Sequence, residues 1–179
     1  MVKIYKLKFT ILQLELLRYL FIRAGEFFNA RTLAKALEVS SPAIAKSLPA
    51  LKKEELIKVN KVAGRLSIEL NRDNLRVISM KRAENLKLLY ESGLVKFLYD
   101  ALPGATIILF GSFASGDDTF SSDIDLAIIG VKEKNLNLAN YQKMLEKSIN
   151  LNYYPSLSLE KHLKNNLLNG IVLKGSIEL

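Results

Sequence analysis

The sequence contains no cysteine, no tryptophan and a single histidine among its 179 residues. Without cysteine, the chain has neither a disulfide framework nor a thiolate zinc site. It also lacks any apolar run near the ~20 residues needed to span a bilayer, because the most hydrophobic early stretch is interrupted by Glu15 and Arg18. The N-terminus has no small-residue cleavage signature, so a signal peptide is not expected. These absences favour an intracellular, cytoplasmic protein that does not enter a membrane.

The excess of positive over negative charge is confined to the first half of the chain. Residues 1–80 contain 15 lysines and arginines against 7 aspartates and glutamates, a net charge of +8. Residues 81–179 contain 11 of each sign, so their net charge is zero. An asymmetry of this kind suggests that the first half meets a polyanion, whereas the alternative is a solvated basic surface.

The first half is patterned as three helices followed by two short strands. Apolar residues at helical spacing predict helices over 9–24, 30–37 and 42–54, and two apolar runs predict strands over 56–60 and 66–70. Thr10, Asn29 and Ser41 are expected as N-caps, with Pro42 in the first turn of the third helix. Pro49 lies inside that helix, where proline removes a hydrogen bond.

Three helices and a basic hairpin resemble a winged helix-turn-helix domain, here residues 1–75. The segment LAKALEVSSPAIAKSLPALKKEELIKV is similar to MarR-like and ArsR-like transcription regulators. The resemblance implies binding of double-stranded DNA, with helix three in the major groove and the hairpin on the backbone. The matching positions are Ser40, Ser41, Ala43, Lys46 and Ser47 on the exposed side of the helix, with Lys61 and Arg65 on the hairpin. Glu55 departs from the pattern, because a glycine often ends helix three in these regulators. A domain used for protein contacts or homodimerisation is the alternative.

The second half is organised around residues 105–130, ATIILFGSFASGDDTFSSDIDLAIIG. Two apolar runs bounded by glycine, serine and aspartate predict buried strands. Asp123 and Asp125 lie two residues apart, so they share one face of their strand, while Ile124 faces the core. Two adjacent carboxylates repel each other unless a cation lies between them. Gly111-Ser112 at the preceding strand end offers a place for phosphates, so the segment predicts a metal-dependent nucleotide site.

Strands and helices alternate through the rest of this half. A helical pattern over 71–102 is interrupted at Ser92-Gly93, and no flexible linker separates the two halves. Further elements are predicted as helices over 140–147 and 158–169, the second capped by Ser158, and as strands over 149–154 and 171–174. The alternation predicts a small α/β domain over 76–179, with 76–102 as connecting helices.

Gly-Ser, ten residues and then Asp-x-Asp resemble the nucleotidyltransferase superfamily that includes DNA polymerase β, and most closely its minimal members. The resemblance implies an α/β (α+β) fold with a short mixed sheet. It also implies that Asp123 and Asp125 are catalytic and bind Mg²⁺, two ions if the protein is active. Gly111, Ser112 and Ser122 would contact a nucleoside triphosphate, expected to be ATP. AMP would be transferred to a hydroxyl of a protein, a nucleic acid or a small molecule.

Two departures weaken the expectation of turnover. Ser115 stands where the family often has a basic residue. Active members also place a third carboxylate on a neighbouring strand, but the expected strand, INLNYYPSLS, contains no acid. Asn150 or Asn152 would occupy that position, and an amide does not accept a proton near neutral pH. The other acids of the motif, Asp117 and Asp118, are interpreted as a solvated turn. The alternative to an enzyme is therefore a transcription regulator whose second half senses nucleotide or mediates assembly.

Overall fold

A computed structural model describes residues 8–62, 64–156 and 160–177 of the chain. The chain divides into two compact units, residues 1–77 and residues 78–179, and each is described by itself. Within the described ranges, no helix is long and apolar enough to cross a membrane.

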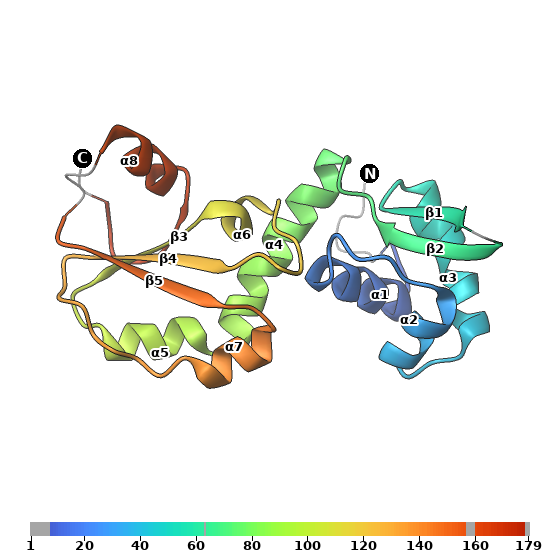
Figure 1. Ribbon diagram of the computed structural model, residues 1–179, viewed down its shortest axis with the longest axis horizontal. Helices are drawn as coiled ribbons and strands as arrows, with labels where there is room; N and C mark the ends of the chain where they lie inside the picture. The colour runs from blue at the N-terminus through green and yellow to red at the C-terminus, as the bar shows by residue number, and fades with distance from the viewer. Residues whose placement is uncertain (1–7, 63, 157–159, 178–179) are drawn as a thin grey trace. The chain divides into compact units, whose positions relative to one another are not determined.

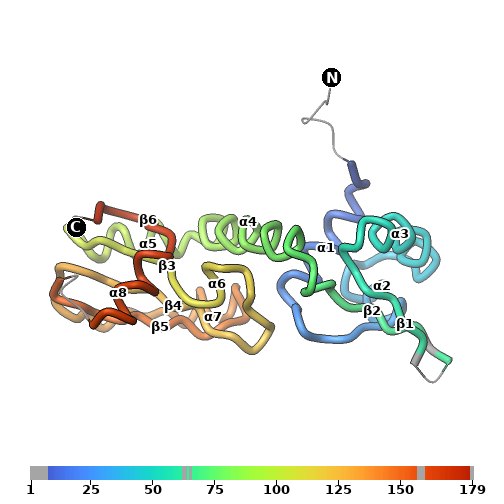
Figure 2. The backbone as a smooth tube through the Cα atoms, turned by 90° about the horizontal axis from the view of Figure 1, so that it is seen from above, coloured from blue at the N-terminus to red at the C-terminus, as the bar shows by residue number. Residues whose placement is uncertain are grey.

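The N-terminal unit contains three helices and a two-stranded sheet (Figure 1). Its elements are α1 (Ile11–Ile22), α2 (Ala30–Ala36), α3 (Ser41–Lys53), β1 (Ile57–Val62) and β2 (Arg65–Leu70). The two strands are antiparallel and lie side by side in Figure 2. An isolated bridge joins Phe28, which precedes α2, to Ile68 in β2, so the hairpin is anchored to the helices.

The helices of this unit begin at side chains that cap them. The hydroxyl of Thr10 accepts a hydrogen bond from the backbone N–H of Gln13, and the backbone N–H of Thr10 donates to Oε1 of the Gln13 side chain, so the two residues form a capping box that starts α1. Asn29 caps α2, as expected. The expected cap of α3 was one residue too late, because Ser40 and not Ser41 accepts from the backbone of Ala43.

At the end of α3, Glu55 occupies the position where a glycine often ends the third helix of such domains. Glu55 has a left-handed backbone with φ of 55°, a conformation that costs a non-glycine residue about 1–2 kcal/mol. Its carbonyl oxygen accepts hydrogen bonds from the side-chain amides of Asn71 and Asn74, at 2.8 and 3.1 Å. These two contacts tie the strained residue to the segment that follows the hairpin, so the turn is held without glycine.

The C-terminal unit is a four-stranded mixed sheet with helices on both faces. Its elements are α4 (Leu75–Glu91, which starts in the first unit), α5 (Leu94–Ala101), β3 (Thr106–Phe110), α6 (Gly111–Ser115), β4 (Ile124–Ile129), α7 (Ala139–Leu145), β5 (Ile149–Tyr154), α8 (Lys161–Leu168) and β6 (Ile171–Lys174). The strand order is β5-β4-β3-β6, with β5 parallel to β4 and the other neighbours antiparallel. This arrangement confirms the α/β fold with a short mixed sheet. Ser158, the expected cap of the last helix, lies outside the described residues.

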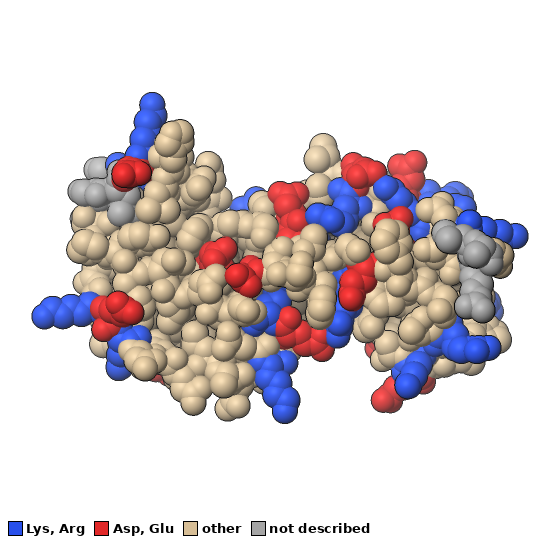
Figure 3. Space-filling model, in the orientation of Figure 1, with Lys and Arg blue, Asp and Glu red and all other residues tan. Residues whose placement is uncertain are grey.

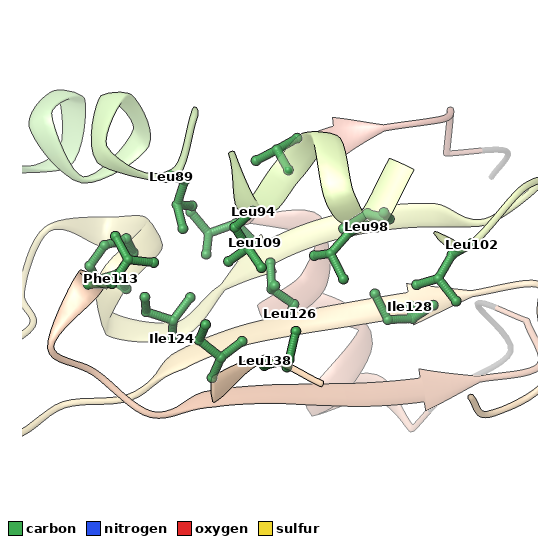
Figure 4. Close-up of a cluster of buried hydrophobic side chains, with 14 of the residues drawn as sticks. Leu89, Leu94, Leu98, Leu102, Leu109, Phe113, Ile124, Leu126, Ile128 and Leu138 are labelled. Atoms are coloured by element: carbon green, nitrogen blue, oxygen red, sulfur yellow. The ribbon is translucent and has the colours of Figure 1, made fainter. Parts of the chain in front are cut away.

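The core of this unit follows from strand alternation. Ile124, Leu126 and Ile128 of β4 are fully buried on the face covered by α4, α5 and α7, as the sequence predicts. Figure 4 shows leucines of α5 pointing toward these strand residues. The opposite face carries Ala127 and Ile129 under Leu167 of α8, which lies on the other side of the strands in Figure 1. Because helices cover both faces of the sheet, the candidate site lies at one end of the strands, where β3 ends and β4 and β5 begin.

Candidate active site

The two aspartates of the motif lie where three strands meet at one end of the sheet. Asp123 directly precedes β4, and Asp125 is the second residue of that strand. Asp125 pairs with Phe110, the last residue of β3, on one side. It pairs with Asn150 of the parallel strand β5 on the other side. The register therefore brings the Gly111 turn, both carboxylates and Asn150 together.

Asn150 is the side chain that faces the two carboxylates from the neighbouring strand. Its amide nitrogen donates hydrogen bonds to Asp123 Oδ2 at 3.2 Å and to Asp125 Oδ1 at 3.0 Å. Asn152, the other candidate, pairs with Ala127 two residues further along and is not part of this contact. The amide offsets the repulsion between the carboxylates by giving one hydrogen to each. It offers no proton acceptor at neutral pH, which distinguishes it from a third carboxylate.

Gly111 makes room for this arrangement. Its φ of 73° is in the left-handed region, and a Cβ there would lie 3.0 Å from Asp125 Oδ2. Any side chain would press on the carboxylate, so the absence of a Cβ both permits the turn and leaves Asp125 in place. The carbonyl oxygen of Ser112 accepts the backbone N–H groups of Gly116 and Asp117 at 2.9 and 3.1 Å, which closes the short helix α6.

The serines near the site make local contacts. Ser122 Oγ accepts the backbone N–H of Thr119 at 2.9 Å, so this hydroxyl closes the turn directly before Asp123. Ser115, at the position where the family often has a basic residue, donates its hydroxyl to the carbonyl oxygen of Ser112 at 3.0 Å. Neither contact involves a carboxylate of the site.

The expectation that Asp117 and Asp118 form a solvated turn was wrong for Asp118. Asp117 is exposed, but the side chain of Asp118 is fully buried. Lys81 of α4 and Lys147, which follows α7, both form ion pairs with it, and Lys147 Nζ lies 3.3 Å from Asp118 Oδ2. Sequence reasoning missed these lysines because α4 and the segment before β5 are distant in the chain. No local pattern marks such a cluster.

The donor set of the site suits Mg²⁺. Mg²⁺ prefers oxygen ligands and is usually bound through one or two carboxylates together with substrate phosphates. Asp123 and Asp125 supply the carboxylates, and rotation of the Asn150 amide would present its oxygen at the same place. Among the residues that the structure describes, no group of three or more histidine, cysteine, aspartate or glutamate side chains is placed so that it could hold a metal ion. The site therefore fits a metal held by two carboxylates better than one held by three.

The residues expected to contact DNA are only partly exposed. The structure exposes Ser40, Lys46 and Lys61 and leaves Ser41 and Ala43 half-buried. Placing Ser47 on the exposed side was wrong, because it is 7% exposed. Its hydroxyl donates to the carbonyl oxygen of Ala43 at 3.0 Å, and its own carbonyl oxygen accepts from Gln13 at 3.2 Å. The side chain of Arg65 lies outside the described part of the chain.

Basic side chains lie on the surface of this unit together with acidic ones (Figure 3). One mixed cluster joins Glu54 to Lys8 and Arg76. The hydrogen bond from Lys8, followed by that from Arg76, holds the pKa of Glu54 below its usual value of 4.5. Part of the positive charge of the first half is therefore paired within the unit.

Comparison with known families gives a match to the C-terminal unit. The family model described as "Nucleotidyltransferase domain" matches residues 92–177, a range that contains the Gly111 turn, both aspartates and Asn150. No curated protein and no solved structure matches the chain. The C-terminal unit is thus similar to nucleotidyltransferase domains, and the match does not extend into the N-terminal unit.

Proposed function

We propose that the C-terminal unit binds Mg²⁺ and a nucleoside triphosphate, ATP, and transfers AMP to a hydroxyl acceptor. The observation that carries the proposal is the pair Asp123 and Asp125, held by Asn150 beside the Gly111 turn at the end of three strands. The match of residues 92–177 to nucleotidyltransferase domains supports the same chemistry.

Each residue has a distinct task in this proposal. Asp123 and Asp125 hold Mg²⁺, which neutralises charge on the triphosphate when bound. Gly111 lets a phosphate approach the backbone, and Ser112 donates its hydroxyl to a phosphate oxygen. The acceptor oxygen then forms a bond to the α-phosphorus while the bond to the β-phosphate oxygen breaks. Pyrophosphate leaves, and the acceptor proton passes to water because Asn150 does not take it up.

Asn150 also favours a second candidate, a regulator that binds nucleotide without transferring it. The two carboxylates are enough to hold a metal with the substrate phosphates, whereas activation of an acceptor hydroxyl benefits from a nearby base. With the amide of Asn150 in place of a third carboxylate, metal binding is retained and activation of the acceptor hydroxyl is weakened. In this candidate, the C-terminal unit senses nucleotide and the N-terminal unit acts on DNA.

Incubation of the full chain with α-labelled ATP, Mg²⁺ and candidate acceptors separates the two functions. Transfer of label that is abolished by Asp123→Asn supports the enzyme. The matched control is Asp100→Asn, the same substitution at an exposed helix residue paired with Lys96, and it should leave transfer unchanged. Mg²⁺-dependent ATP binding without transfer supports the regulator. Absence of both binding and transfer refutes the proposal.

We also propose that the N-terminal unit binds double-stranded DNA as a winged helix. The order of three helices and a hairpin supports this, as does the bridge between Phe28 and Ile68 that anchors the hairpin. Lys46 on α3 and Lys61 on β1 are exposed and would contact phosphates. Ser40 and Ser41 begin the helix that would enter the major groove.

A salt titration of duplex binding tests the DNA proposal. Each phosphate contact contributes about 0.9 to the slope of log affinity against log salt, so Lys46→Ala and Lys61→Ala should each lower the slope by about one. Lys96→Ala, an exposed lysine of α5 in the other unit, is the matched control. Slopes that do not change in either variant would contradict the assigned contacts.

A further inference from the structure

The segment between α6 and β4 is held by a buried cluster of charges beneath the candidate site. The side chain of Asp118 is 0% exposed, and the side chains of Lys81 and Lys147 are 2% and 4% exposed. Asn85 of α4 completes the cluster, because its amide nitrogen donates to Asp118 Oδ1 at 2.7 Å and to the carbonyl oxygen of Phe113 at 2.9 Å. One carboxylate and two ammonium groups are therefore desolvated together. Desolvation of charges is costly, so the contacts they make must offset it.

The two lysines make different contacts within this cluster. Lys81 contacts Asp118, the Asn85 side chain and the Phe113 ring. Lys147 also donates to the backbone carbonyl oxygens of Thr119 at 2.6 Å and Ser122 at 3.2 Å. Lys147 thus holds both ends of the turn that directly precedes Asp123.

Lys147 also lies at the start of the strand that carries Asn150. Ile124, which follows Asp123, donates its backbone N–H to the carbonyl oxygen of Ser148 at 2.9 Å and pairs with Ile149. The same lysine therefore lies between the segment that delivers Asp123 and the segment that delivers Asn150. Its ammonium group contacts the turn before Asp123, and its backbone leads within three residues to Asn150.

We propose that Lys147 is a positioning residue of the site: through the carbonyl oxygens of 119–122 it holds Asp123 at the distance from Asn150 and Asp125 that metal and nucleotide binding require. The proposal rests on the proposed function of the C-terminal unit. Lys147 itself does not reach the carboxylates of the site. Removal of groups that orient metal ligands typically weakens metal binding about 10–100-fold, and the same range is expected here.

Two substitutions of the same kind separate positioning from stability. Lys147→Met and Lys81→Met each remove one buried ammonium group and leave Asp118 with one lysine, so the charge balance of both variants is the same. Lys147→Met removes the donors that Lys147 supplies to Thr119 and Ser122 in the turn before Asp123. The affinity of the full chain for α,β-methylene-ATP, an analogue that does not release pyrophosphate, is measured by calorimetry at a series of Mg²⁺ concentrations. A loss of about 10–100-fold is expected for Lys147→Met, and a much smaller loss for Lys81→Met.

The controls distinguish the possible failures. Lys143→Met, at an exposed lysine of α7, should bind as the natural chain does. Equal losses for Lys147→Met and Lys81→Met would overturn the positioning role, because the cluster would then act only through stability. If Lys147→Met does not fold, Lys147→Arg decides, since a guanidinium group supplies donors to the same carbonyl oxygens: retained binding supports positioning, and loss of binding in a folded variant overturns it.

Hydrogen exchange provides a measurement that does not depend on nucleotide. The Ile124 amide should exchange faster in Lys147→Met than in Lys81→Met, because the turn before it has lost its donors. If the natural chain binds no nucleotide, the proposed function fails, while this difference still supports the tie between Lys147 and the turn. An unchanged exchange rate overturns that tie.

Discussion

Replacement of Asn150 by aspartate is the most informative single change in this protein. The substitution keeps the size of the side chain but removes the amide hydrogens that now bind Asp123 Oδ2 and Asp125 Oδ1. A third carboxylate is introduced at the same place. Without metal, three carboxylates then lie within contact distance at neutral pH. With Mg²⁺, the same three groups form a more strongly negative oxygen site.

The expected magnitude follows from these contacts. Two unit charges 4 Å apart interact by about 1 kcal/mol in water and about 4 kcal/mol at an effective dielectric constant of 20. Asn150 and Asp123 are exposed, so the repulsion between each pair of carboxylates lies near the lower value. Two new repulsions of about 1 kcal/mol each and two lost hydrogen bonds of about 0.5–1.5 kcal/mol each should together lower the free energy of unfolding by about 3–5 kcal/mol in the absence of metal.

Mg²⁺ should reverse this loss. A ligand present at about 100 times its dissociation constant stabilises the native state by about 2.7 kcal/mol, so saturating Mg²⁺ restores most of the stability of Asn150→Asp. The assay is urea-induced unfolding of the natural chain and the variant, in EDTA and in excess Mg²⁺. Transfer of α-labelled AMP should also rise in the variant, because the added carboxylate accepts a proton.

Asn152→Asp is the matched control for this prediction. It places the same new charge on β5, but its backbone partner is Ala127 and not a carboxylate. Its stability should depend on Mg²⁺ no more than that of the natural chain. The reasoning is refuted if Asn150→Asp is as stable as the natural chain in EDTA, or if Mg²⁺ stabilises both aspartate variants equally.

Three further changes test other parts of the structure. Gly111→Ala should weaken Mg²⁺–ATP binding measured by calorimetry, because the new Cβ presses on Asp125. Gly104→Ala is the control, because Gly104 has a similar positive φ but open space around it. Equal effects of the two substitutions would show that backbone strain alone is responsible. Leu126→Ala should lower the free energy of unfolding by about 2–5 kcal/mol, because this side chain is 0% exposed in the core; a loss well under 1 kcal/mol in urea unfolding would contradict that packing. Glu54 has a lowered pKa in the folded state through its hydrogen bond with Lys8 and then Arg76, so its stabilising contribution is present above its usual pKa of 4.5 and declines as the pH falls through the folded value. The difference in urea stability between the natural chain and Glu54→Gln should therefore shrink in acid, and a difference that grows in acid would be inconsistent with these ion pairs.

Much of the fold follows from local sequence patterns. The break between α4 and α5 at Ser92-Gly93 and the strand Ile149–Tyr154 are where periodicity predicts them. Local signals work here because helical periodicity and buried apolar runs depend on neighbouring residues. The predicted cap of α3 was one residue away from the observed cap, because both Ser40 and Ser41 are chemically able to cap a helix.

The candidate site is less accessible from the sequence, because its contacts are long-range. From the sequence, either Asn150 or Asn152 could be the residue that faces the carboxylates. Only the register of β4 with β5 decides between these two candidates. The burial of Asp118 depends on Lys81 and Lys147, which are 37 residues before it and 29 after it. Ser47 illustrates the same limit at short range, since a small polar residue on a helix suits either face.

The parallel pairing of β4 with β5 has a consequence for the order in which the chain folds. β3 and β4 are antiparallel neighbours joined by residues 111–123, which include α6, whereas β5 reaches β4 only after the longer crossover over residues 130–148 that contains α7. Contacts across longer loops form more slowly because more chain entropy is lost first. We expect the two carboxylates, which β4 already places on one face, to lie beside β3 before Asn150 arrives and donates a hydrogen bond to each. In that order, docking of β5 is the step that relieves the repulsion between the two carboxylates.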